Sequence, residues 1–216
     1  LGTPLGIDIV FADNYRTKAA QERRDAIREA GFVPVLEREI DGFRRVADAI
    51  SHELLRADVF LGGDSEAVAL WTEDTPAGPV ACRGMLDHVI LTPARAVVLD
   101  LKTCDSAHPQ ACAAHVLKYG YDIQRAAYVS AVEKVRPDLA GRVDFVWAFA
   151  EELPGPRVAL TVARADGSMR EIGGRKWARA CETWARCLAS GEWPGYATGG
   201  VELAAPNWAL VEEAMV

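Results

Sequence analysis

Two apolar runs, at residues 80–91 and 96–101, stand on either side of Thr92-Pro93-Ala94-Arg95. Both runs are rich in Val, Ile and Leu, which favour strands, and the segment between them has the composition of a turn. The pattern therefore predicts an antiparallel hairpin. Further strand candidates lie at residues 67–72, 143–149 and 157–162.

Four other segments have the spacing or composition of helices, namely residues 17–30, 34–56, 109–135 and 177–189. A short apolar run at residues 6–12 fits either a strand or the start of a buried helix. Because helices come before, between and after the strands, we expect an α+β or mixed α/β fold, with a central mixed β-sheet flanked by helices. No long linker or repeat divides the chain, so we expect one domain over residues 1–216.

The overall charge and the cysteine pattern exclude some classes of protein. The chain has 24 Lys and Arg against 31 Asp and Glu, a net charge of −7, which excludes a uniformly basic nucleic-acid coat but not a local basic groove. Its five cysteines include no Cys-x-x-Cys pair, as expected of a reduced, intracellular protein. No apolar run is long enough to cross a membrane. The chain starts at Leu1 without a leader pattern or a Met, so we expect a trimmed N-terminus.

The residues that could bind a metal or take part in catalysis lie in and around the predicted hairpin. Asp100 and Lys102 are two residues apart on a predicted strand, so they share one face, and the hairpin can bring Asp87 beside Asp100. Two carboxylates are costly to desolvate together, and a divalent cation such as Mg²⁺ or Mn²⁺ would offset their repulsion. The carbonyl oxygen of Leu101 could supply a further ligand. The alternative is a strand-end ion pair of Asp100 and Lys102 beside a turn aspartate.

Such a set suits metal-assisted hydrolysis of a phosphodiester, in which a lysine can orient the water or stabilise charge on the phosphate. Gln124 and Tyr128 are four residues apart, so they share one helix face. Glu66 could add a carboxylate at the same edge of the sheet. Taken singly, Gln124 and Tyr128 also fit a surface and a core position, and Glu66 fits a solvated loop.

Together these residues resemble the PD-(D/E)XK nuclease superfamily, with its restriction-endonuclease-like core. The nearer branch is the RecE-like one (exodeoxyribonuclease VIII type), and lambda exonuclease is more distantly similar. The matching stretches are Ser65-Glu66 with Leu70-Trp71, residues 83–87, residues 98–103, residues 119–128, Trp193-Pro194-Gly195-Tyr196 and Pro206-Asn207-Trp208.

The resemblance implies a metal-dependent 5′-to-3′ exonuclease that acts on the ends of linear double-stranded DNA in recombination or repair. Carried over residue by residue, Asp87 and Asp100 match the metal-binding carboxylates and Lys102 the catalytic lysine. Gln124 and Tyr128 match the motif that steadies the site, and Glu66 matches an acidic residue near the metal. A ring-shaped homo-oligomer, a single-strand annealing protein as partner, and a cytoplasmic location in a bacterial or phage-infected cell are further expectations.

One position departs from the family pattern. Relatives often begin with Gly-Thr-x-x-His, in which the histidine helps to bind metal, whereas this chain has Gly2-Thr3-Pro4-Leu5-Gly6. Either the site works with oxygen ligands alone, or the chain is a weakened or inactive DNA-binding or assembly protein. If Gly6 occupies the histidine position, a histidine restored there should raise metal affinity.

A nuclease of CRISPR adaptation is an alternative with the same fold. Such relatives hold an iron–sulfur cluster with four cysteines, and that cysteine pattern is missing here.

The candidate DNA contacts are basic residues, which equally fit solvated helix faces. They are Arg16, Lys18, Arg23, Arg24, Arg44, Arg45, Lys118 and Arg125.

Overall fold

The computed structural model describes residues 6–56, 62–152, 158–196, 200 and 202–205. In chain order its elements are β1 (Ile7–Val10), α1 (Lys18–Glu29), β2 (Val33–Leu36), α2 (Glu37–Arg56), β3 (Asp64–Thr75), β4 (Gly78–Leu91), β5 (Ala96–Cys104), α3 (Pro109–Tyr119), α4 (Tyr121–Val135), the 3₁₀ helix η1 (Pro137–Leu139), β6 (Val143–Glu152), β7 (Val158–Ala163) and α5 (Gly167–Ser190). The segment Pro206-Asn207-Trp208 lies outside the described residues.

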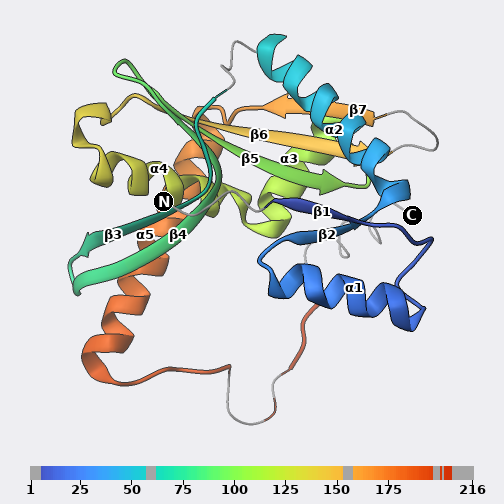
Figure 1. Ribbon diagram of the computed structural model, residues 1–216. Helices are drawn as coiled ribbons and strands as arrows, with labels where there is room; N and C mark the ends of the chain where they lie inside the picture. The colour runs from blue at the N-terminus through green and yellow to red at the C-terminus, as the bar shows by residue number, and fades with distance from the viewer. Residues whose placement is uncertain (1–5, 57–61, 153–157, 197–199, 201, 206–216) are drawn as a thin grey trace, which may run out of the picture.

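The central sheet has the strand order β3-β4-β5-β6-β7 (Figure 1). Strands β5 and β6 are parallel, and the other neighbours are antiparallel. Parallel neighbours need a crossover, which α3 and α4 provide. This mixed sheet with flanking helices confirms the predicted fold class, and the predicted hairpin is the antiparallel pair β4–β5.

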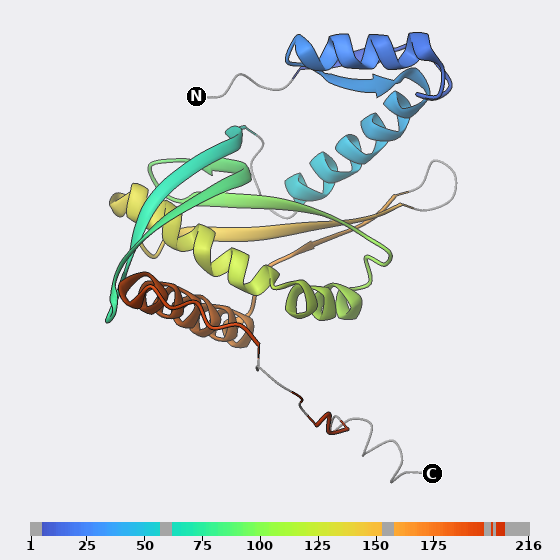
Figure 2. The same ribbon diagram turned by 90° about the horizontal axis from the view of Figure 1, so that it is seen from below.

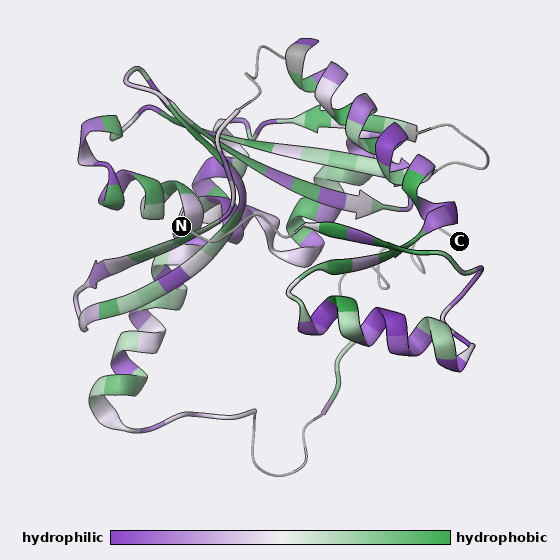
Figure 3. Ribbon diagram, viewed as in Figure 1, coloured by the Kyte–Doolittle hydropathy of each residue, from purple (hydrophilic) through white to green (hydrophobic). Residues whose placement is uncertain are grey.

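Helices cover both faces of this sheet. Helices α3, α4 and α5 lie on one face and α2 on the other, as Figure 2 shows with the sheet seen nearly edge-on. Beside the sheet, β1 and β2 form a separate parallel pair connected by α1. Figure 3 shows that β1, β2 and β7 are mostly hydrophobic and that α1 is mostly hydrophilic.

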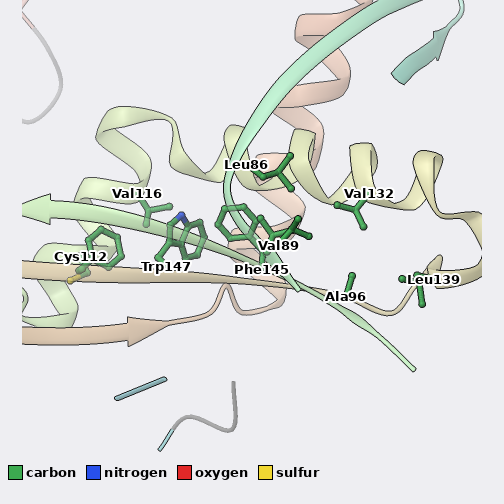
Figure 4. Close-up of a cluster of buried hydrophobic side chains, with 11 residues drawn as sticks. Leu86, Val89, Ala96, Cys112, Val116, Val132, Leu139, Phe145 and Trp147 are labelled. Carbon is green, nitrogen blue, oxygen red and sulfur yellow. The ribbon is translucent and has the colours of Figure 1, made fainter. Parts of the chain in front are cut away.

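The main core lies between the sheet and the helices α3 and α4 (Figure 4). It contains Leu86, Val89, Ala96, Val98, Cys112, Val116, Val132, Leu139, Phe145, Trp147 and Phe149. A smaller cluster on the α2 face contains Leu54, Ile90, Val97 and Val146. Since Val97 and Val98 point to opposite faces, Asp100 shares the α4 face with Val98.

Three predicted boundaries were wrong. Residues 33–36 are strand β2 rather than the start of a helix, because Val33 to Leu36 pair in parallel with β1. The single helix predicted over 109–135 is broken at Gly120, whose φ of 72° ends α3 and starts α4. Helix α5 begins at Gly167, ten residues before the predicted start, because its Asp166 N-cap outweighs the weak helix propensity of Gly173 and Gly174.

No helix in the described part of the chain is long and apolar enough to cross a membrane.

Candidate active site

The strand pair β3–β4 changes its inward face beside the predicted site. Over most of its length, Ala67 and Ala69 pack inward while Val68 and Leu70 are 56% and 68% exposed. On β4, Leu86 and Val89 both belong to the main core although they are three residues apart. Strict alternation cannot bury both, so the strand rotates between them.

Glu66 and Asp87 lie where this rotation occurs. Cα pairing is regular on either side, with Ser65 opposite His88 and Ala67 opposite Leu86. Glu66 has a φ of 52°, in the left-handed region that residues other than glycine rarely adopt. The two acidic residues thus occupy matching positions on neighbouring strands at a local break in the ladder.

Asp87 reaches β5 with its side chain. The β4–β5 ladder stops at the pair His88 and Leu99. Beyond it, Asp87 Oδ2 accepts a hydrogen bond from the backbone N–H of Leu101 at 3.0 Å. In an extended strand the N–H and C=O of one residue point to the same side, so the Leu101 carbonyl also faces the side where β4 diverges.

Asp100 is a buried carboxylate between β5 and α4. Its side chain is 0% exposed, and its Oδ1 accepts a hydrogen bond from Gln124 Nε2 at 2.8 Å. Lys102 Nζ lies 2.6 Å from Oδ2 in an ion pair. Apart from Lys102, no described residue contacts Oδ2 through a hydrogen bond or ion pair, so a metal ion at this oxygen would share it with the ammonium.

Burial raises the pKa of the Asp100 carboxyl above its ordinary value, and the charge of Asp87 adds to this effect. The ammonium of Lys102 and the hydrogen bond from Gln124 oppose it without reversing it. The carboxylate form of Asp100 is therefore costly in the folded protein. A second cation at the site would lower that cost.

Lys102 is held from its other side by an aromatic ring. Its side chain is 16% exposed, and its Nζ lies 4.5 Å from the centre of the Tyr121 ring. This cation–π contact and the Asp100 ion pair together fix the position of the ammonium. Tyr121 was not among the predicted site residues, although a tyrosine three residues before Gln124 lies on the same side of a helix.

Tyr128 and Gln124 both contact the hairpin from α4. The Tyr128 hydroxyl donates a hydrogen bond to the carbonyl of Met85 at 2.9 Å. Gly84 makes room for this ring, because a Cβ at Gly84 would lie 2.8 Å from Tyr128 Cε1 and 3.4 Å from the Trp71 ring. One face of α4 therefore connects β4 and β5 at the level of the two aspartates.

Glu66 and Gly6 are less integrated into this site. Glu66 is exposed and forms no hydrogen bond or ion pair with another described residue. Gly6 lies just before β1, and its carbonyl accepts a hydrogen bond from Val33 N at 2.9 Å. Among described residues, the atoms within 4 Å of a Cβ at Gly6 belong to the Phe32 ring, the nearest at 2.7 Å. This geometry does not support the expectation that a histidine at position 6 would reach the metal. Residues 2–5 of the matching motif lie outside the described residues.

The donor set fits a hard divalent cation. Asp87 and Asp100 offer carboxylate oxygens, and the Leu101 carbonyl faces the same opening. Within the described ranges, however, no three His, Cys, Asp or Glu side chains gather at one point. The protein therefore provides two acidic side chains and a carbonyl rather than a closed cage.

The candidate DNA contacts differ in whether they form ion pairs with acidic residues. On α1 and α2, four of the basic side chains form ion pairs with nearby acids: Lys18 with Glu22, Arg23 with Asp8, Arg24 with Asp25, and Arg44 with Asp41. Arg125, next to Gln124, forms no ion pair with a described residue, and burial and the charge of Arg170 lower its pKa.

Comparisons with known proteins identify a family and a similar fold. A family model described as "PDDEXK-like domain of unknown function (DUF3799)" matches residues 11–205. A crystal structure of a candidate exonuclease from Eubacterium rectale is similar with a TM-score of 0.52 at 14% sequence identity, over 82% of this chain. This chain spans only 64% of that protein, and the likeness shows the fold alone.

A second solved structure and the curated protein sequences show no close similarity to this chain. The structure of SSO0001 has 15% identity over 71% of this chain and 70% of its own, but its TM-score is 0.34. No curated protein sequence matches. Because the family model matches residues 11–205, this chain belongs to the family of PDDEXK-like domains of unknown function.

Proposed function

We propose that this protein is a metal-dependent deoxyribonuclease that hydrolyses phosphodiester bonds of linear double-stranded DNA. The observation that carries the proposal is the buried Asp100, held by Gln124 and paired with Lys102 beside Asp87. Two carboxylates and a fixed ammonium at one end of a strand pair are the groups that metal-assisted phosphodiester hydrolysis requires.

Asp87, Asp100 and the Leu101 carbonyl would hold Mg²⁺ or Mn²⁺, and the exposed Glu66 side chain would have to turn toward the ion to add a further carboxylate. When bound, the ion would activate water and neutralise phosphate charge. Lys102 would orient the attacking water or stabilise the charge that develops on the phosphate, because its ammonium is fixed by Asp100 and Tyr121. Gln124 would keep Asp100 in position, and Tyr128 would keep α4 against β4.

The direction and biological setting rest on the RecE-like resemblance. We propose 5′-to-3′ digestion from duplex ends, in recombination or repair, with a single-strand annealing protein as partner. A homo-oligomer would gather Arg125 and other unpaired basic groups around the DNA while the outer surface stays acidic, consistent with the net charge of −7. A cytoplasmic location would follow from this role.

A second candidate is a DNA-binding or assembly protein with weakened activity. It is favoured by the absence of a third acidic, His or Cys side chain at the site within the described residues. Such a protein would bind duplex ends without cutting them. A CRISPR-adaptation nuclease has less support, since none of the five cysteines gathers with two other His, Cys, Asp or Glu side chains of the described chain.

The test is a cleavage assay on linear duplex labelled at the 5′ or the 3′ end, with Mg²⁺, with Mn²⁺ and with EDTA. We expect metal-dependent release of the 5′ label first. Asp100→Ala and Lys102→Ala should each lower the rate by about 10²-fold or more. Asp105→Ala is the matched control, because Asp105 is an exposed aspartate just after β5. Binding of duplex ends without cleavage by the wild type would favour the second candidate.

A further inference from the structure

A second buried carboxylate lies on α4, two residues before Gln124. Asp122 is in the first turn of α4, and its side chain is 0% exposed. Lys176 of α5 reaches it with Nζ 2.7 Å from Oδ2, while the Lys176 side chain stays 30% exposed. The other oxygen, Oδ1, has no hydrogen-bond partner in the described part of the chain.

The two helices approach each other closely at this point. Gly173 lies about one turn before Lys176 on α5, and a Cβ there would be 2.3 Å from the Asp122 carbonyl oxygen. Any larger side chain would push α5 away from α4. The glycine and the lysine of α5 therefore both fix the start of α4.

No side chain caps the start of α4. Its N-cap is Gly120, which offers no side-chain oxygen to the free N–H groups of the first turn. A carboxylate in the first turn is favourable because it lies near the positive end of the helix dipole. Its burial is costly, however, unless a cation is paired with it. Lys176 supplies that cation.

This first turn carries both groups that hold the catalytic pair. Tyr121 precedes Asp122 and contacts Lys102, and Gln124 follows it and donates to Asp100. A shift or rotation of the turn would move the two contacts together. The proposed catalytic residues lie on the sheet, but the parts that orient them are fixed to α5.

We infer that Lys176 and Asp122 form a positioning ion pair that sets the first turn of α4, and through Tyr121 and Gln124 the geometry of Lys102 and Asp100. Lys176 touches neither catalytic side chain, so it is a positioning residue. The inference rests on the proposed nuclease function for its effect on rate, but not for its effect on the Gln124 contact.

The test compares Lys176→Met with Arg175→Met. Arg175 is the neighbouring residue, and its ion pair with Glu171 is exposed on both sides. Lys176→Met should lower kcat for DNA cleavage by about 10- to 100-fold, the scale of a small misplacement, with KM unchanged. It should also shift the NMR signals of the Gln124 side-chain amide. Arg175→Met should change neither.

The double variant Asp122→Asn with Lys176→Met separates positioning from stability. It removes the unpaired buried carboxylate, so the unfolding midpoint should return toward the wild-type value while kcat stays low. Recovery of both quantities together would overturn the inference. If the wild type does not cleave DNA, the proposed function fails and the Gln124 signals decide alone: wild-type positions of those signals in Lys176→Met would overturn the inference.

Discussion

Glu66 and Asp87 face each other across β3 and β4 at a point where the regular pairing of the two strands is interrupted. Ser65 and Ala67, on either side of Glu66, pair with His88 and Leu86. The left-handed φ of 52° at Glu66 coincides with the rotation that frees Asp87 to reach Leu101. An unfavourable backbone conformation is thus located beside the proposed metal ligands, as is common at functional sites.

Two substitutions at Glu66 separate the backbone conformation from the charge. Glu66→Gly relieves a left-handed conformation that costs about 1–2 kcal/mol but loses about 0.5–1 kcal/mol to chain entropy, so we expect a net gain in stability of about 0.5–1 kcal/mol. Glu66→Gln should leave stability nearly unchanged. Both variants should need more Mg²⁺ for half-maximal cleavage than the wild type.

Urea unfolding and Mg²⁺ titration of cleavage measure these two effects. If Glu66→Gln titrates like the wild type, the Glu66 carboxylate takes no part in metal binding. Equal stability of the Gly and Gln variants would mean that the left-handed backbone costs no more than the chain entropy that glycine loses, about 0.5–1 kcal/mol.

The raised pKa of Asp100 predicts how stability depends on pH. The folded protein holds this proton more tightly than the unfolded chain, so between the ordinary aspartate pKa and the raised one the contribution of Asp100 to stability falls as pH rises. In EDTA at pH 7, Asp100→Asn should therefore be more stable than the wild type. We expect a higher unfolding midpoint, and each kcal/mol gained raises it by about 2–4 °C in a domain of this size.

The gain from Asp100→Asn should shrink below about pH 4, where the carboxyl is protonated in both states. Thermal unfolding from pH 3 to pH 8 follows this difference, with Asp105→Asn as the exposed control. A variant that is less stable than the wild type at every pH would show that the Lys102 ion pair outweighs the burial of the carboxylate.

Substitution of Glu73 should lower the stability of the fold without lowering the rate of DNA cleavage. Its Oε1 accepts hydrogen bonds from Trp71 Nε1 at 2.9 Å, Trp177 Nε1 at 3.0 Å and Ser130 Oγ at 2.5 Å, so one carboxylate connects β3, α4 and α5. Glu73→Ala should lower the free energy of unfolding by at least about 1.5–3 kcal/mol, the contribution of hydrogen bonds to a charged group.

The rate of cleavage at 25 °C by folded Glu73→Ala should stay within about twofold of the wild type, because Glu73 contacts α4 at Ser130, in the second half of the helix, and not at the first turn that holds Tyr121 and Gln124. Asp74→Ala is the matched control, because the Asp74 side chain is 86% exposed and contacts only Lys134 among the described residues. Similar unfolding midpoints for Glu73→Ala and Asp74→Ala would contradict this account of the Glu73 contacts.

Gly6→His tests the departure from the family pattern. A Cβ at position 6 meets the Phe32 ring at 2.7 Å, so the substitution should destabilise the protein by about 1–3 kcal/mol, the usual cost of overpacking. Gly6→Ala adds the same Cβ without an imidazole. We expect both variants to show the Mg²⁺ titration curve of the wild type. A lower Mg²⁺ requirement for the histidine variant alone would contradict this expectation and show that residue 6 lies close to the metal.

Local patterns predicted much of this fold and the neighbourhood of the site. Apolar runs around a turn predicted the β4–β5 hairpin, and the period of a strand placed Asp100 and Lys102 on one face. The period of a helix placed Gln124 and Tyr128 together, and both contact the hairpin. These relationships depend on residues close in sequence or on a regular repeat.

The features that the sequence did not predict depend on distant partners or on a single backbone angle. Lys176 and Asp122 are 54 residues apart, and no local sequence pattern predicts that they form an ion pair. The left-handed φ of Glu66 is unusual for a glutamate, so residue type gave no signal. Strand β2 forms because β1 pairs with it, which overrides the helical spacing that begins at Pro34.

The location of a bound metal ion tests the central claim most directly. A crystal of the protein soaked in Mn²⁺ shows the ion by its anomalous diffraction. We predict a peak between the carboxylates of Asp87 and Asp100, next to the Leu101 carbonyl, that disappears in Asp100→Asn. Manganese bound elsewhere, with no peak at these two carboxylates, would contradict the proposed metal site.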